Sequence, residues 1–290
     1  MPARGFLIFL TIFLSSNAFV PNQSASEAVA NRIRTDKVIQ DNLRQLNKIR
    51  RTAGLDTVNI APGISEGCFY HANYLVRNEN HKLVEGLSAH DEYEELPGYT
   101  RAGANAGGNS VISFGNPDHA INHLMATFYH RIPLIDPNLK RVGYGFVRYK
   151  GSKNAVTVID VRLGKSYSRF IECIAYPADG QKNIPRLFQN EIPAPFKDID
   201  SWTLGYPVTF TFHRNINIDS VKITFTSGKQ YVPFYFSTPD NPGAAGKDYQ
   251  QNTVCVVSRR YLSSKTKYTV TLNCLANDSL FIKKISFTTE

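Results

Sequence analysis

The spacing of apolar residues changes along the chain, and this change constrains the fold more than any other feature. Before residue 170, apolar residues recur at helical spacing, as in the stripe from Ile39 to Ile49. Beyond residue 200 they alternate at a period of two, as in the run from Val208 to Phe212. Between these regions, residues 174–200 contain several prolines, which exclude a helix. We therefore predict an α+β chain with two domains, at residues 26–170 and 174–290.

The first domain is expected to be an α/β(α) sandwich. Gly54 is suited to end its first helix, and the Asn116-Pro117 pair is suited to begin its third. Residues 79–116 lack periodicity, and we expect a long irregular loop of the kind that often carries function. The predicted elements are helices at residues 26–52 and 64–77 and from residue 117, and strands at residues 141–149 and 155–161.

The N-terminus has the pattern of a signal peptide. Arg4 provides a positive charge, residues 6–14 form a short apolar run, and Ser16-Asn17-Ala18 provides small residues for cleavage. The apolar run is about half the length that a membrane span needs. We predict a signal peptide at residues 1–18, no transmembrane span in the mature chain, and a secreted or periplasmic, envelope-associated protein.

The charge and the motifs limit the classes of partner. A net charge of +9 favours anionic partners such as wall polymers or acidic lipids. No long basic run, phosphate loop, zinc-finger spacing or other nucleic-acid motif occurs. No Gly-x-Ser-x-Gly elbow marks a hydrolase nucleophile. The sequence leaves the identity of the extracellular ligand open among lipid, wall polymer and protein.

The chain contains four cysteines. Cys255 and Cys274 lie symmetrically about Ser264-Lys265, and strand-like sequences flank that point. A hairpin turning there would place the two sulfurs opposite each other, and export permits disulfides. We therefore predict a Cys255–Cys274 disulfide, while the pairing of Cys68 with Cys173 stays open.

Three short motifs carry a resemblance to a known family. They are Gly98-Tyr99-Thr100, the run Ala106-Gly107-Gly108-Asn109-Ser110, and Tyr129-His130-Arg131, with His90 preceding the first two. In order and spacing, residues 40–165 resemble the CAP superfamily of cysteine-rich secretory, antigen 5 and pathogenesis-related proteins, in its bacterial type. The second domain resembles the bacterial immunoglobulin-like modules, through the segment that starts at Tyr176-Pro177 and the closing residues Phe287-Thr288-Thr289.

The resemblance implies a cleft that holds a histidine pair and two acidic residues. His90 and His130 match the histidine positions, which can hold a divalent metal such as zinc, and Asn109 and Tyr129 are implied neighbours. Gly108 and Thr127 stand about where the family has its acidic residues. Glu92 is the expected replacement.

Other histidines need separate interpretation. His71 lies on the inner face of the second predicted helix, where it is either a buried hydrogen-bonded side chain or a further cleft residue. His119 and His123 have a spacing that permits metal binding, but we expect them on a solvent-exposed helix face.

Three functions are compatible with these residues. The favoured one is a non-catalytic extracellular or envelope binding module that uses the histidine-lined cleft. The alternative is a metal-dependent hydrolase of wall polymer, peptide or nucleic acid, with Glu92 as its base. A third is a purely structural spacer whose second domain carries the partner contacts.

Overall fold

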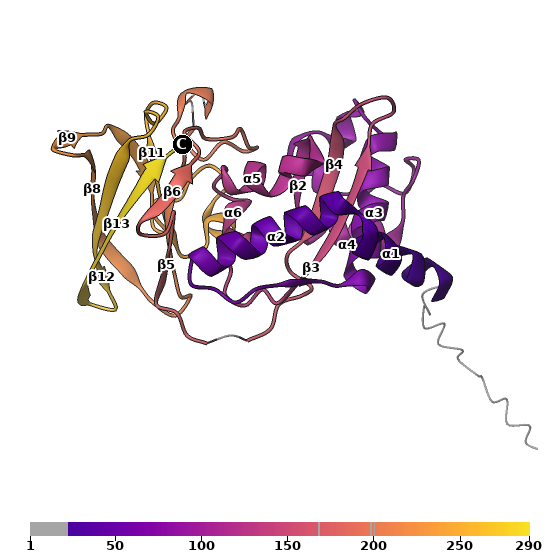
Figure 1. Ribbon diagram of the computed structural model, residues 1–290, viewed down its shortest axis with the longest axis horizontal. Helices are drawn as coiled ribbons and strands as arrows, with labels where there is room; N and C mark the ends of the chain where they lie inside the picture. Colours follow the sequence, from indigo (N-terminus) through magenta and orange to yellow (C-terminus); the bar gives the residue numbers. More distant parts are fainter. Residues whose placement is uncertain (1–22, 168, 198, 200) are drawn as a thin grey trace, which may run out of the picture.

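The computed structural model describes residues 23–167, 169–197, 199 and 201–290, and the predicted signal peptide lies outside them. Figure 1 shows two lobes, one of helices and a sheet from α1 to β4 and one of strands from β5 to β13. This arrangement confirms the predicted α+β class. Within the described ranges, no helix has both the length and the apolar character that crossing a membrane requires.

A four-stranded sheet forms the middle layer of the first lobe. Its strand order is β1-β3-β4-β2. The pairing of β1 with β3 is parallel, whereas β4 pairs antiparallel with both β3 and β2. The strands are β1 (Asn59–Ile60), β2 (Ser110–Gly115), β3 (Arg141–Arg148) and β4 (Ala155–Asp160).

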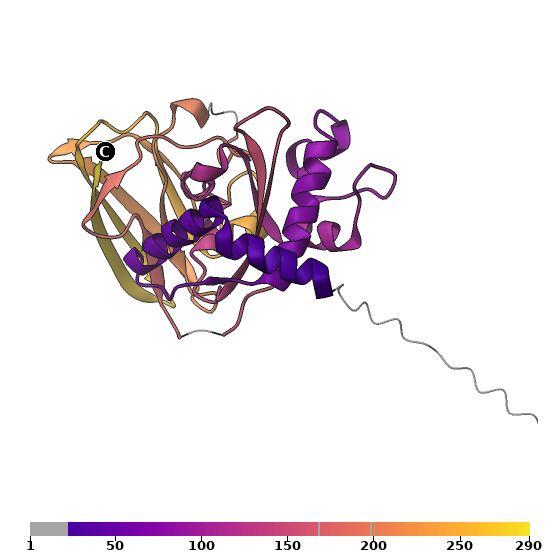
Figure 2. The same cartoon turned by 45° about the vertical axis from the view of Figure 1, so that its right-hand side comes forward.

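Helices cover both faces of this sheet, as Figure 2 shows for α2 and α3. The helices α2 (Lys37–Thr52) and α5 (Ala120–Met125) share an apolar core with Val111 and Ile159. The helices α3 (Pro62–Arg77) and α4 (Arg101–Gly108) pack against Ile112, Val156 and Val158 on the other face. A Cβ at Gly145 would lie 2.4 Å from the backbone nitrogen of Phe69, so glycine allows α3 to approach β3. The first lobe is thus the three-layer sandwich that we predicted.

Two predicted boundaries in this lobe are wrong. The first helix is interrupted at Asp36 into α1 (Gln23–Thr35) and α2, because the Asp36 carboxylate caps α2 by accepting hydrogen bonds from the backbone N–H groups of Val38 and Ile39. The segment predicted as an irregular loop contains α4 and β2. The Thr100 hydroxyl caps α4 by accepting from Gly103, and the small residues of this short helix hide its periodicity.

The elements between these helices are short. Asn116 caps η3 (Pro117–His119), which leads into α5, as the Asn-Pro pair predicted. The remaining short helices of the first lobe are η1 (Lys82–Val84), η2 (Gly86–His90) and α6 (Arg131–Leu134).

The second lobe consists of two sheets around a common apolar core. One has the order β10-β11-β7-β5 and the other β6-β13-β12-β8-β9. Phe210 of the first sheet and Phe225 and Phe287 of the second belong to one buried cluster. Its elements are β5 (Cys173–Tyr176), β6 (Gln181–Ile184), η4 (Ser201–Thr203), β7 (Val208–Phe212), β8 (Ile218–Ser227), β9 (Gln230–Tyr231), β10 (Phe234–Ser237), α7 (Lys247–Gln250), β11 (Thr253–Ser258), β12 (Lys267–Ala276) and β13 (Ser279–Thr289).

The predicted Cys255–Cys274 disulfide is absent, and all four cysteines are free thiols. Cys255 lies on β11, which pairs with β10 and β7, whereas Cys274 lies on β12, which pairs with β13 and β8. The segment 259–266 therefore connects the two sheets and does not form a hairpin. A period of two identifies strands, but it does not say which strands pair.

Candidate ligand-binding cavity

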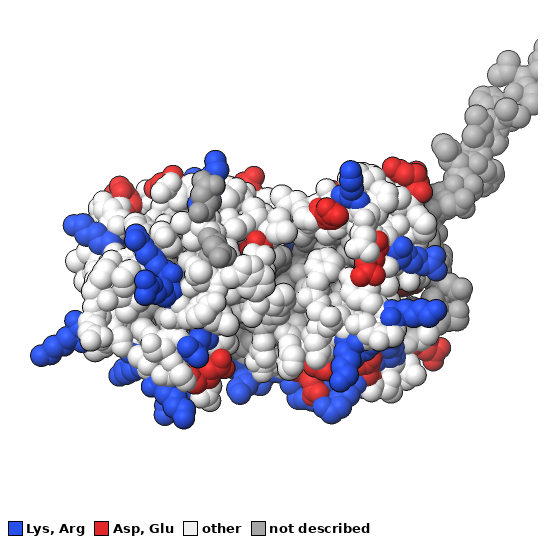
Figure 3. All heavy atoms as spheres, turned by 90° about the horizontal axis from the view of Figure 1, so that it is seen from above, with Lys and Arg blue, Asp and Glu red and all other residues white. Residues whose placement is uncertain are grey.

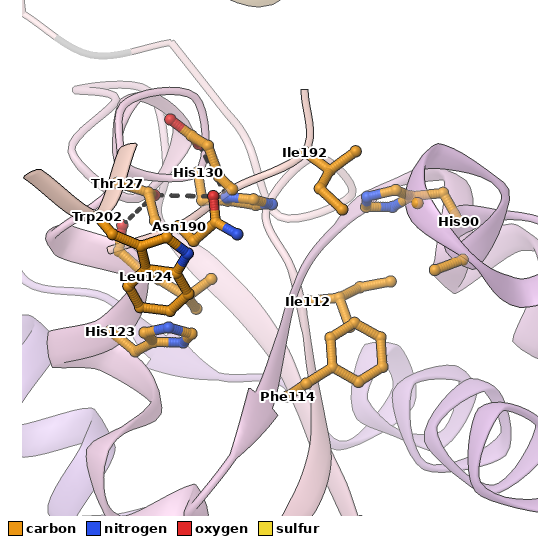
Figure 4. Close-up of a pocket in the computed structure, with 13 residues that line it drawn as sticks. His90, Ile112, Phe114, His123, Leu124, Thr127, His130, Asn190, Ile192 and Trp202 are labelled. Carbon is orange, nitrogen blue, oxygen red and sulfur yellow. Dashed lines mark hydrogen bonds and ion pairs between the residues drawn. The ribbon is translucent and has the colours of Figure 1, made fainter. Parts of the chain in front are cut away.

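A cavity of about 330 Å³ lies between the two lobes. Figure 4 shows His90 on one side of it and His123, His130 and Trp202 on the other, with Ile112 and Phe114 from β2 between them. We call it the central cavity. Its lining consists of Gly86, Ala89, His90, Ile112, Phe114, His123, Leu124, Thr127, His130, Asn190, Glu191, Ile192 and Trp202.

The imidazole of His90, the last residue of η2, is fixed by a hydrogen bond to the backbone. Its Nδ1 lies 3.0 Å from the Gly107 carbonyl oxygen, which is only an acceptor, so Nδ1 carries a proton. Burial lowers the pKa of His90, and the neighbouring His130 and His71 lower it further, against the opposing effect of the Gly107 carbonyl. The neutral ring therefore offers the lone pair of Nε2. A Cβ at Gly107 would lie 2.5 Å from the His90 carbonyl oxygen, so this packing requires glycine.

His130 is held by a carboxylate of the second lobe, from the segment between β6 and β7. Its Nδ1 lies 3.1 Å from Oε2 of Glu191. The same carboxylate accepts hydrogen bonds from the backbone N–H groups of Phe128 at 2.7 Å and Tyr129 at 3.0 Å. The Glu191 side chain is fully buried, and that of His130 is 20% exposed. Three donors therefore fix this carboxylate, and it orients the imidazole of His130.

His123 lines the central cavity, although we expected it to face solvent. Its Nδ1 lies 3.0 Å from the hydroxyl oxygen of Ser113 on β2. Burial lowers the pKa of His123, and the proximity of His130 adds to this effect. The prediction failed because α5 is short and its outer side faces the second lobe, which the sequence pattern of one helix does not reveal. His119, by contrast, is exposed, as predicted.

The structure places His71 and Glu92 beneath the cavity and not in its lining. Both side chains are fully buried, and Nδ1 of His71 lies 2.9 Å from Oε1 of Glu92. The second ring nitrogen faces the carbonyl oxygen of Ala89 at 2.9 Å, and Oε2 of Glu92 accepts from Thr100 N–H. Both ring nitrogens thus face oxygen atoms of the protein. This pair connects α3, the segment after η2 and the start of α4, and it leaves Glu92 unable to act as a ligand or base in the cavity.

The two implied neighbours also lie outside the central cavity. Asn109 caps the end of α4, where its side-chain amide donates to the Asn105 carbonyl at 2.8 Å. The Tyr129 ring is buried, and its hydroxyl accepts a hydrogen bond from Ala245 N–H of the second lobe at 3.0 Å. Tyr129 therefore joins the lobes.

Sequence reasoning missed the residues that the second lobe contributes from the segment between β6 and β7. Asn190, Glu191, Ile192 and Trp202 all line the central cavity. Glu191 stands 61 residues from His130, next to prolines that marked the segment only as a linker. No local pattern indicates that its carboxylate would contact the first lobe.

The cavity does not fit a metal centre held by protein ligands alone. Zinc takes about four ligands, or three and a water molecule. His90 and His130 supply two ring nitrogens, and among the described residues of the lining the only carboxylate is Glu191, which three donors already occupy. Among the residues described by the structure, no group of three or more His, Cys, Asp or Glu side chains is arranged to hold a metal ion.

A comparison with protein families finds a match within the first lobe. Residues 43–160 match the family model for CAP, the cysteine-rich secretory protein family. A search of curated proteins gives no match. The matched range spans most of α2 to the end of β4 and includes all three cavity histidines, but it excludes Glu191. The first lobe therefore contains a region similar to the CAP family, and the second lobe lies outside the matched range.

Proposed function

We propose that this protein is an exported, non-catalytic binding module whose ligand occupies the central cavity. The observation that carries the proposal is the state of the three imidazoles. Each of them, His90, His123 and His130, engages its Nδ1 with a protein oxygen, and no protein partner among the described residues contacts its Nε2. Three oriented polar atoms thus line an otherwise largely apolar cavity, which is the usual composition of a ligand site.

The lack of a free carboxylate among the described residues of this lining disfavours a carboxylate-dependent hydrolase and supports a binding role. A general base must reach the proton that it abstracts. Glu191 already accepts three hydrogen bonds, and Glu92 is buried outside the cavity. The thiol of Cys68 is also buried elsewhere, and burial raises its pKa, which disfavours the nucleophilic thiolate.

A fragment screen by two-dimensional NMR tests this proposal, because such a screen does not require an identified ligand. A standard library of small polar and aromatic fragments is added to the mature chain, and chemical-shift changes are mapped. We expect binders to perturb Ile112, Thr127 and His130 together. The variant Asn190→Trp fills the cavity from an exposed position, and the double variant His90→Ala/His130→Ala removes two polar anchors. Both should retain the fold and lose these binders, and a library that perturbs other surfaces only would contradict the proposal.

One observation favours a metal-dependent hydrolase as the second candidate. Histidines that ligate metals usually donate their other N–H to a carbonyl or carboxylate, as His90 and His130 do here. In this case a carboxylate base would be Glu191, because no other carboxylate of the described residues lines the cavity. Peptidoglycan, casein and RNA are suitable substrates for a turnover assay with added zinc. Turnover that is lost in Glu191→Gln but kept in Glu172→Gln would favour the hydrolase, and we expect no turnover.

A further inference from the structure

The central cavity is the middle of a longer groove along the junction of the lobes. A first side hollow of about 290 Å³, lined in part by His119 and Gln189, shares Phe114 and His123 with it. A second side hollow of about 90 Å³, lined in part by Tyr249, shares His90, His130 and Ile192 with the central cavity. The two side hollows have no lining residue in common, so they continue the cavity in different directions.

Exposed aromatic rings occur along this groove. Trp202 is 62% exposed, Phe114 is 48% exposed and Tyr249 is 50% exposed. Phe114 belongs to the first lobe, whereas Trp202 and Tyr249 belong to the second lobe. The face in Figure 3 is hollowed between the lobes, and most charged side chains in that view lie on the lobes themselves. Aromatic surface is thus available at several points along an elongated, weakly charged site.

The polar groups of the groove suit a ligand rich in hydroxyl groups. The neutral imidazole of His90 offers an Nε2 lone pair, which accepts hydrogen bonds, and Nε2 of His123 accepts or donates according to the direction of the Ser113 hydroxyl. Among its described residues, the central lining contains no Lys or Arg, and its one carboxylate is occupied by three donors. In the second side hollow, Lys165 is paired with Asp136 at 2.6 Å, and the remaining charged lining residues, Arg162 and Asp248, have opposite signs. A strongly anionic or cationic polymer would therefore find little complementary charge.

We propose that this groove binds an extended, uncharged glycan chain, an inference that rests on the proposed binding function and names its ligand class. A sugar ring has an apolar C–H face and a rim of hydroxyl donors. The aromatic side chains can stack on that face, and the imidazole nitrogens can accept from the rim. A chain of several rings would contact both lobes, so the second lobe is part of the binding site.

The same contacts disfavour a lipid chain. An alkyl chain in the central cavity would cover the three Nε2 atoms and leave them without partners. Each buried polar group without a hydrogen bond costs about 1–3 kcal/mol. A glycan avoids this cost because its hydroxyl groups replace the displaced water.

Retention on insoluble polysaccharides, followed by calorimetry, tests the inference. Chitin, cellulose, xylan, curdlan and peptidoglycan are incubated with the mature chain, and the bound fraction is measured. Oligomers of two and six sugars from the retaining polymer are then titrated. We expect the six-sugar oligomer to bind more tightly, and Trp202→Ala or Phe114→Ala to weaken it about tenfold or more. Tyr231→Ala is the matched control, because this ring is 65% exposed on the second lobe outside the groove.

Each of the other outcomes would contradict the inference, and each points to a different explanation. No retention by any polymer, or retention that Tyr231→Ala weakens as much as Trp202→Ala, excludes a glycan in this groove. Binding of cis-parinaric acid that Trp202→Ala removes would assign the groove to lipids and leave the binding function intact. Failure of polymers, fatty acid and fragments together would remove the binding function as well.

Discussion

Glu191 accepts a hydrogen bond from His130 across the junction of the two lobes, with 3.1 Å between Oε2 and Nδ1. Gly108 and Thr127 stand where the family resemblance implies acidic side chains. The carboxylate that orients His130 comes from the segment between β6 and β7 of the second lobe, outside the matched range 43–160. The orientation of a histidine within the matched range thus depends on a residue outside it.

The substitution Glu191→Gln should lower the free energy of unfolding and loosen the orientation of His130 in the cavity. A glutamine presents one N–H₂ group toward the donors of Phe128, Tyr129 and His130, so at least one hydrogen bond is lost. Hydrogen bonds to charged groups are worth about 1.5–3 kcal/mol, and we expect a loss of that size in the free energy of unfolding. Urea denaturation measures it. Glu172→Gln, at an exposed position, is the control, and equal effects of both substitutions would contradict the assigned role of Glu191.

Arg131, the neighbour of His130, should also be required for the two lobes to pack together. Its guanidinium is fully buried and donates to the carbonyl oxygens of Met125 in the first lobe and Pro207 in the second. It also lies over the ring of Tyr206, 4.6 Å from the centroid. In Arg131→Met these carbonyls lose their donor, and because an unsatisfied buried polar group costs about 1–3 kcal/mol, we expect a loss of at least that size in the free energy of unfolding. Denaturant titration should show this loss, whereas Arg162→Met at an exposed position should change little.

These residues show where sequence reasoning succeeds and where it stops. His90 and His130 were predicted to share a cleft because family motifs fix their places around one sheet, and the structure places both on one cavity. The inner face of α3 followed from helical spacing, which is a local property. Glu191 and Trp202 could not be predicted, because their roles arise from the packing of one lobe on the other. The cysteine pairing failed for the same reason, since strand partners are chosen over long sequence distances.

Counting the free thiols tests whether any disulfide forms in this chain. In denaturant without reductant, Ellman's reagent should titrate four thiols per chain, because all four cysteines are free. In the native protein Cys255 should react slowly, since it is fully buried and burial raises the pKa of its thiol. A count of two in denaturant would show that a disulfide forms and would contradict the strand assignment.

Zinc should bind weakly to the mature chain. Two imidazoles provide about half of the ligands that zinc usually takes. We therefore expect calorimetry and elemental analysis to show no stoichiometric zinc at micromolar concentrations. The double variant His90→Ala/His130→Ala should behave like the wild type. One zinc ion per chain that disappears in the double variant would reveal a further ligand and would strengthen the hydrolase alternative.

Stability should fall as the pH falls below about 6.5. Burial lowers the pKa values of His90 and His123 below the ordinary value of 6.5. Near and below pH 6.5 the unfolded chain therefore binds more protons than the folded one. Their contribution to the free energy of unfolding is complete above that pH and decreases as the pH drops through 6.5 toward the lowered values. Thermal unfolding between about pH 8 and pH 5 should show this decrease, and His90→Asn/His123→Asn should reduce it. A double variant with the full wild-type decrease would contradict the assignment to the cavity histidines.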